Sequence, residues 1–242
     1  MARRILLKVS GESLALPGEG GLDPGILGRL ANELTLAATA GLQVAVVVGG
    51  GNFLRGQQLA HSGIERSRAD FMGMLATIMN GIALQSAIES QGGRAEVLSA
   101  IALGPRVPEF EVRRCVASLE RGEISVLVGG TGHPYFTTDT CAALRAVEIG
   151  ADLLVKGTKV DGVYTGDPKR DPEARLFKAL SFQDVLEKRL GVMDSTAIAL
   201  CQEHGLPILV FNLLEDGNLR KVLRGEDLGT LVGGESRPRA EE

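Results

Sequence analysis

Cysteine and histidine are scarce in this 242-residue chain, and their scarcity excludes several kinds of site. The three cysteines, Cys115, Cys141 and Cys201, are odd in number and show no CxxC spacing, which argues against a disulfide framework or a metal cage. The three histidines are scattered and predict no metal site. The pattern is typical of buried thiols in a reducing compartment, and we predict no protein metal centre.

The chain also lacks an excess of positive charge and a long apolar run. Lys and Arg number 26 against 30 Asp and Glu, a net charge of −4, so nucleic acid is a poor candidate partner. No stretch approaches the eighteen or so apolar residues of a membrane span, and the first apolar run is too short for a signal sequence. We therefore expect a cytoplasmic protein without a membrane segment.

Two common nucleotide-binding signatures are absent. The sequence contains no GxxxxGK[ST] loop and no GxGxxG after its first apolar run. These absences argue against a P-loop enzyme and against a dinucleotide-binding Rossmann unit. Any nucleotide site must be built from other loops.

The stretch ISVLVGGTGHPYFTTD, residues 124–139, organises the rest of the chain. Its first five residues predict a buried strand, and its glycines let a ligand approach the backbone. Thr137 and Thr138 offer hydroxyls and a helix cap, and Asp139 opens a helical run. A strand, a glycine turn and a helix N-terminus together favour a phosphate-bearing ligand over an ordinary tight turn.

Two further glycine turns follow predicted strands. KVSGE at residues 8–12 ends the first strand, and Lys8 there is either a phosphate contact or a solvated surface lysine. Gly49, Gly50 and Gly51 end the second strand, and Arg55 lies within reach of that loop. Because carboxyl ends of parallel strands meet at one sheet edge, we expect these turns to converge there.

The alternation of apolar runs and helical patterns predicts an α/β fold, a three-layer α/β/α sandwich with a mainly parallel central sheet. We expect one domain over residues 1–235 and a disordered tail at 236–242. Predicted strands cover residues 3–9, 43–48, 95–99, 124–128, 152–156, 207–211 and 229–232. Predicted helices cover residues 24–40, 66–91, 109–121, 140–148, 182–190, 195–204 and 219–224.

Two residues have competing interpretations. Asp70, in the first turn of the long predicted helix, is a helix-dipole partner or an acceptor for ligand hydroxyls, and the sequence alone favours the dipole role. Tyr164 follows a hairpin signal at Asp161-Gly162 and either lines a base or ribose or packs under the hairpin.

On the long helix, Phe71, Leu75, Ile78 and Ile82 are predicted to share one face.

Nearly the whole chain, about residues 3–233, resembles the bacterial uridylate kinases of the amino-acid-kinase family. The resemblance rests on KVSGE (8–12), VVGGGNFLRG (47–56), DFMGMLATIMNG (70–81), GGTGHPYFTTDT (129–140) and KGTKVDGVYTGDP (156–168). It implies transfer of the γ-phosphoryl group of ATP to UMP, with Mg²⁺, in pyrimidine nucleotide synthesis. Residues 1–150 would form mainly the UMP-binding half and residues 151–235 mainly the ATP-binding half.

The resemblance also implies roles for individual residues. Lys8, Arg55 and Asp139 would be catalytic, with Asp139 orienting Lys8 or the metal, and Lys156 and Lys159 remain open as further phosphate contacts. The implied ATP contacts are Lys8, Val9, Ser10, Gly11, Gly51, Arg55, Thr158, Tyr164 and Asp167. The implied UMP contacts are Gly50, Asp70, Thr131, Gly132, His133, Pro134, Tyr135, Phe136, Thr137 and Thr138.

The resemblance implies a homohexamer with the helix from Arg66 near an interface, and feedback inhibition by UTP. Many relatives carry Asn where His133 stands. The loop 16–21 aligns with a segment linked to GTP activation, and its Pro17 and Gly20 leave GTP activation open.

Two alternatives share part of this pattern. Another amino-acid kinase, phosphorylating a carboxylate or carbamate, would need neither the TGHPYFTTD loop nor Asp70. A non-catalytic relative that binds nucleotide or an oxyanion could lose Lys8 or Asp139, and this chain keeps both.

Overall fold

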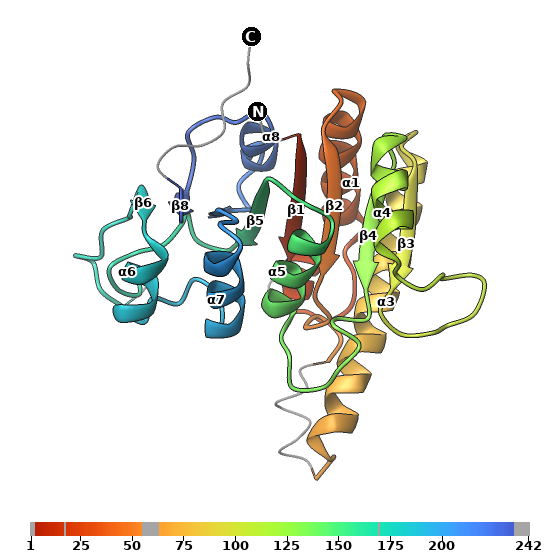
Figure 1. Cartoon of the computed structure of the whole chain (residues 1–242), viewed down its shortest axis with the longest axis horizontal. Helices are drawn as coiled ribbons and strands as arrows, with labels where there is room; N and C mark the ends of the chain where they lie inside the picture. The colour runs from red at the N-terminus through yellow and green to blue at the C-terminus, as the bar shows by residue number, and fades with distance from the viewer. Residues whose placement is uncertain (1–2, 17, 55–62, 169, 235–242) are drawn as a thin grey trace.

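An eight-stranded, mainly parallel sheet forms the centre of the computed structural model, which describes residues 3–16, 18–54, 63–168 and 170–234 (Figure 1). The strand order is β3-β4-β2-β1-β5-β7-β8-β6, and only the β7–β8 pair is antiparallel. The strands are β1 Arg4–Val9, β2 Gln43–Val48, β3 Ala95–Ser99, β4 Ile124–Val128, β5 Leu153–Thr158, β6 Ala179–Leu180, β7 Ile208–Asn212 and β8 Thr230–Val232.

Helices cover both faces of the sheet and bury two separate cores. Alternation along β1 sends Leu7 into one core and Leu6 into the other. The first core packs against α1 Pro24–Thr39, α3 Arg66–Ser90 and α8 Asn218–Leu223. The second packs against α4 Val112–Glu120, α5 Thr138–Glu148, α6 Phe182–Glu187 and α7 Ser195–Glu203. The predicted three-layer α/β/α fold is confirmed.

The long helix α3 differs from its predicted packing. Of the four residues expected on one face, only Ile78 is buried, while Phe71, Leu75 and Ile82 are exposed. The buried side of α3 is lined instead by small or polar residues such as Asn80 and by a few larger apolar ones. The apolar periodicity therefore predicted a stripe of neighbouring side chains on α3, but three of its four residues face away from the sheet.

Three short features also depart from the sequence prediction. The 3-10 turn η1 Gly11–Leu14 and strand β6 were not expected. Asp161-Gly162 does not form the predicted tight hairpin turn. The chain reverses only after Tyr164, which pairs antiparallel with Leu176. The expected tail at 236–242 lies outside the described residues.

The three cysteines are free and buried, as the sequence indicated. Burial raises the pKa of Cys141 to about 11, which makes its thiol a poor nucleophile. By length and composition α3 is the one helix, among the residues described, that could cross a membrane. It packs along the sheet in the first core, and core helices of soluble proteins pass the same test.

Candidate active site

The carboxyl ends of β1, β2, β4 and β5 lie along one edge of the sheet, and the turns that follow them meet there. Gly11, after β1, is so close to the β2 turn that an added Cβ would lie 2.6 Å from the backbone N of Gly51. An added Cβ on Gly49 would lie 3.5 Å from Oγ1 of Thr138, at the start of α5. The expected convergence of the glycine turns is confirmed, and at Gly11 only glycine fits.

Two buried asparagines hold the β2 turn against α3. The side chains of Asn52 and Asn80 donate to each other's Oδ1 atoms at 2.9 and 2.7 Å. Asn80 also donates to the carbonyl of Gly49 at 2.6 Å. Because an unpaired buried amide is costly, this reciprocal pair fixes the position of the glycine turn. Gly50 packs tightly on the same helix, with an added Cβ placed 2.7 Å from the carbonyl of Gly73.

Two lysines on adjacent strands share one carboxylate. Lys8 and Lys156 are register partners in β1 and β5, so their side chains emerge side by side on the face covered by α5. Asp139, in the first turn of α5, reaches between them: Oδ1 lies 2.8 Å from Nζ of Lys8 and Oδ2 lies 2.7 Å from Nζ of Lys156. Lys156 donates a further hydrogen bond to the carbonyl of Val192.

All three side chains are largely buried, which shapes their electrostatics. Burial alone would raise the pKa of Asp139, but the two ammonium groups outweigh it and hold that pKa below its usual value. Burial lowers the pKa of Lys156, with a smaller lowering from the charge of Lys8, and Asp139 opposes both. Lys8 and Lys156 bring two positive charges beside the glycine turns, where phosphate could approach, and Asp139 and the nearby Asp194 balance them in part.

The start of α5 is tied to α7 through one carboxylate. Thr137 caps α5, accepting hydrogen bonds from the backbone N–H groups of Asp139 and Thr140. The hydroxyls of Thr137 and Thr140 both donate to Asp194, whose side chain also caps α7. This network fixes the turn that carries Asp139.

Residues 131–136, the first part of the predicted UMP loop 131–138, lie next to the start of α3. Gly130 and Gly132 have positive φ values of 59° and 81°, which the turn requires. Asp70 accepts a 2.8 Å hydrogen bond from the backbone N–H of Tyr135 and pairs with Arg66 at 2.8 Å. The structure therefore brings Asp70 and this loop together, although the sequence alone favoured a helix-dipole role for Asp70.

The predicted adenosine residues lie at the end of β5 and in the segment after it. Thr158 donates to the carbonyl of Val160 at 2.6 Å, and Tyr164 is partly exposed, with its hydroxyl 3.2 Å from Oδ2 of Asp161. Lys159 extends from this segment to Glu12, with 3.2 Å between Nζ and Oε2. That ion pair links the segment after β5 to η1. Lys159 therefore pairs with Glu12, whereas Lys8 and Lys156 pair with Asp139.

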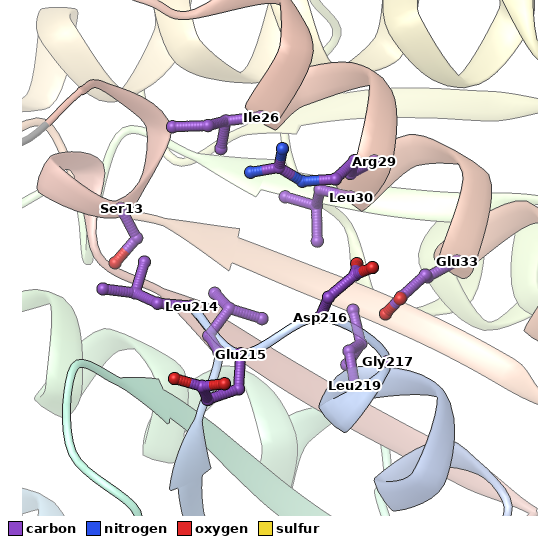
Figure 2. A pocket seen from close by; sticks show the side chains of 11 residues that line it. Ser13, Ile26, Arg29, Leu30, Glu33, Leu214, Glu215, Asp216, Gly217 and Leu219 are labelled. Atoms are coloured by element: carbon purple, nitrogen blue, oxygen red, sulfur yellow. The ribbon is translucent and has the colours of Figure 1, made fainter.

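A small cavity of about 60 Å³ lies on the face of the sheet opposite α5, between α1 and the segment joining β7 to α8 (Figure 2). Ser13 lines it, and its buried hydroxyl has no hydrogen-bond partner among the residues described. The volume suits one or two ordered waters. Because α1 and α8 pack on the face opposite α5, this cavity is separate from the lysine cluster.

Sequence reasoning identified some of these residues and missed others. Lys8, Ser10, Gly11, the β2 glycines and Thr138 lie at the converging turns, while the Val9 side chain lies in the core and offers only its backbone. Arg55 lies outside the described residues. Asn80 and Asp194 were not singled out, although Asn80 stands in the DFMGMLATIMNG motif and Asp194 stands at a recognisable helix cap.

Comparison with known proteins agrees with this architecture. The model of the amino acid kinase family matches residues 3–212. A uridylate kinase of Xanthomonas oryzae pv. oryzae is 50% identical over 234 residues, covering 97% of this chain and 98% of that protein. A chloroplastic uridylate kinase of Arabidopsis thaliana is 49% identical over 96% of this chain and 69% of its own length.

Solved structures give the same result. The UMP kinase of Bacillus anthracis superposes with a TM-score of 0.93 at 33% identity, covering 99% of both chains. The UMP kinase of Ureaplasma parvum superposes with a TM-score of 0.90 at 37% identity, covering 96% of this chain and 99% of its own. With its sheet, its glycine turns and its full-length relatives in agreement, this chain belongs to the amino acid kinase family.

Proposed function

We propose that this chain transfers the γ-phosphoryl group of ATP to UMP, giving UDP and ADP. The observation that carries the proposal is the Lys8–Asp139–Lys156 cluster, placed where three glycine turns converge. The full-length similarity to uridylate kinases supports UMP as the acceptor. UMP-dependent appearance of UDP and ADP in a ³¹P NMR time course tests it, and ATP loss without UDP would contradict it.

The chemistry needs alignment and neutralisation more than covalent help. An oxygen of the UMP phosphate attacks the γ-phosphorus, and the bond from that phosphorus to the bridging oxygen of the β-phosphate breaks as ADP leaves. Lys8 and Lys156 would offset charge on the transferring oxygens. Asp139 would hold the two ammonium groups in place, since each of its carboxylate oxygens lies within 2.8 Å of a lysine nitrogen.

Magnesium fits this site as a partner of the substrate phosphates. Among the described residues no group of three carboxylate, histidine or cysteine side chains could hold a metal ion, and both oxygens of Asp139 are already paired with lysines. Mg²⁺ commonly binds through nucleotide phosphates and keeps several waters, so we expect it to arrive with ATP. Once bound, it would neutralise phosphate charge.

The substrate contacts follow from this arrangement and the family resemblance. We assign UMP to Gly50, Asp70 and the loop from Thr131 to Thr138, mainly within residues 1–150. ATP phosphates would contact Lys8, Ser10, Gly11 and Gly51, with the adenosine held by Thr158, Tyr164 and Asp167 from residues 151–235. Of the two further lysines, contact with Asp139 favours Lys156, because Lys159 pairs with Glu12 instead. A cytoplasmic role in pyrimidine synthesis, with UTP as feedback inhibitor, completes the proposal.

Replacing Asp70 with alanine should raise the KM for UMP about tenfold or more while changing kcat less. A charged acceptor of ribose hydroxyls contributes about 1.5–3 kcal/mol to binding. Steady-state kinetics with UMP varied at saturating ATP measure the effect. An unchanged KM would remove Asp70 from the ribose site.

We also propose a homohexamer with α3 at an interface. Phe71, Leu75, Met79 and Ile82 recur every three or four residues on the exposed side of α3, each more than a third exposed. A contiguous apolar stripe of this kind usually marks an interaction surface. The stripe runs along the helix and needs a partner surface of matching length.

Light scattering should give about six times the monomer mass of 25.5 kDa. Leu75→Glu should shift the protein to smaller species, because it buries a charge in the interface. Leu186→Glu is the matched control, since Leu75 and Leu186 are both 38% exposed and Leu186 lies on α6. A monomeric wild type, or a hexamer unaffected by Leu75→Glu, would contradict this assignment.

A further inference from the structure

Asp70 is part of a three-residue cluster that joins α3 to the loop at residues 131–136. Nε of Arg66 lies 2.8 Å from Oδ1 and 2.9 Å from Oδ2 of Asp70, one helical turn away. Oδ2 also accepts the backbone N–H of Tyr135 at 2.8 Å. The Arg66 guanidinium lies 5.9 Å from the centre of the Tyr135 ring.

These contacts leave Asp70 with limited capacity. An ionised carboxylate has about four acceptor positions, two on each oxygen. Among the described residues, Arg66 occupies one position on each oxygen and Tyr135 takes the second on Oδ2, which leaves one position, on Oδ1. The Asp70 side chain is only 13% exposed, which restricts how a ligand can reach that position.

Tyr135 adds a second observation. Its φ of 72° lies in the left-handed region, which costs a non-glycine residue on the order of 1 kcal/mol. Its backbone N–H donates to Asp70 and its ring lies over the Arg66 guanidinium, so both contacts tie this residue to the start of α3. The same carboxylate therefore holds the loop and, as far as the contacts of the described residues go, keeps one acceptor position on Oδ1.

We propose that Arg66 is a positioning residue for nucleotide recognition: it orients the Asp70 carboxylate so that Oδ1 accepts one ribose hydroxyl, while Oδ2 holds the loop 131–136 through Tyr135. This inference rests on the proposed function, because it takes UMP as the ligand at Asp70. It adds that a single hydroxyl dominates ribose recognition as long as the Tyr135 bond persists. Arg66 does not contact the reacting atoms.

The test compares Arg66→Gln with Arg66→Lys and with Arg114→Gln as a matched control. Arg114 also pairs with a carboxylate, Glu96, and its side chain is 49% exposed against 41% for Arg66, but it lies on α4. Calorimetry measures Kd for UMP, 2′-deoxy-UMP and 3′-deoxy-UMP on the full chain. Wild type should bind one deoxy analogue much more weakly than the other.

We define the ribose preference as the Kd of the more weakly bound deoxy analogue divided by the Kd of UMP. Arg66→Gln should weaken UMP binding about tenfold and binding of that analogue much less, so this ratio falls toward one. Arg66→Lys should recover part of it, because lysine keeps the charge but not the planar fork. Arg114→Gln should leave the Kd for UMP and the ribose preference unchanged. A lowered melting temperature in Arg66→Gln with an unchanged ribose preference would show a purely structural role and overturn the inference.

Asp70→Asn separates this inference from the proposed function. If Asp70→Asn abolishes the ribose preference and Arg66→Gln leaves it intact, Asp70 reads ribose without help from Arg66, and only this inference fails. If wild type does not bind UMP in calorimetry, the proposed function itself fails.

Discussion

Replacing Lys8 with alanine should lower kcat at least about a hundredfold. The variant loses one charged contact to the transferring phosphoryl group, and contacts of this kind contribute on the order of a hundredfold or more to rates. It should still fold, because Asp139 keeps its 2.7 Å contact with Lys156. Steady-state turnover at saturating ATP and UMP, with a thermal melt to confirm folding, measures the effect.

Lys188→Ala is the control for this variant. Lys188 also pairs with a carboxylate, Asp184 at 2.7 Å, but it lies at the exposed end of α6. Its loss should leave turnover unchanged. Near-normal turnover of Lys8→Ala would show that Lys156 or Lys159 carries the role assigned to Lys8.

Asp139→Asn should affect both stability and activity. At neutral pH it leaves the neighbouring ammonium groups of Lys8 and Lys156 without their shared counter-charge. Removing one partner of a buried ion pair costs about 3 kcal/mol or more. We expect a fall of this size in the free energy of unfolding and a loss of kcat of about a hundredfold, measured by urea unfolding and by steady-state kinetics.

The double variant Asp139→Asn/Lys156→Met provides the control. It removes the like-charge contact between Lys8 and Lys156, so it should recover much of the stability but not the activity. Equal instability of the single and double variants would show that the loss comes from packing or from the α5 cap rather than from unbalanced charge.

The pH dependence of stability gives a further signature of Asp139. Its folded pKa lies below the unfolded value, so the stabilisation is present above the unfolded pKa and is lost as pH falls through the folded pKa. Wild type should therefore lose more stability than Asp139→Asn on acidification. The difference between their free energies of unfolding should narrow at low pH, and a constant difference would contradict the charge explanation.

The central strands could be predicted closely because they are buried on both faces. β2 and β4, inside the sheet, match their predicted bounds, since fully buried parallel strands are nearly continuous apolar runs. The edge strand β3 matches its predicted bounds as well. The packing of α3 could not be predicted from its large apolar residues. Its buried side carries Ala76, Gly81 and Asn80, and an added Cβ on Gly81 would lie 2.3 Å from a methyl of Val128. Small residues allow the helix to approach the sheet, and the large ones remain outside.

The site was predicted in its parts rather than in its connections. Lys8 and Asp139 stand in recognisable local patterns, and each is where the sequence indicated. That Lys156 shares Asp139 with Lys8 depends on the register of β1 against β5, which no local pattern gives. The same holds for Asn52 with Asn80 and for Asp70 with Tyr135, since both bonds join segments far apart in the sequence.

The most direct test of the proposed reaction is a coupled ADP-release assay with ATP and Mg²⁺. UMP, CMP, dUMP, aspartate, acetylglutamate and carbamate are offered one at a time as acceptors. We predict turnover with UMP alone. Turnover only with an amino acid or carbamate would keep the fold and contradict the acceptor, and nucleotide binding without any turnover would contradict the catalytic role of the lysine cluster.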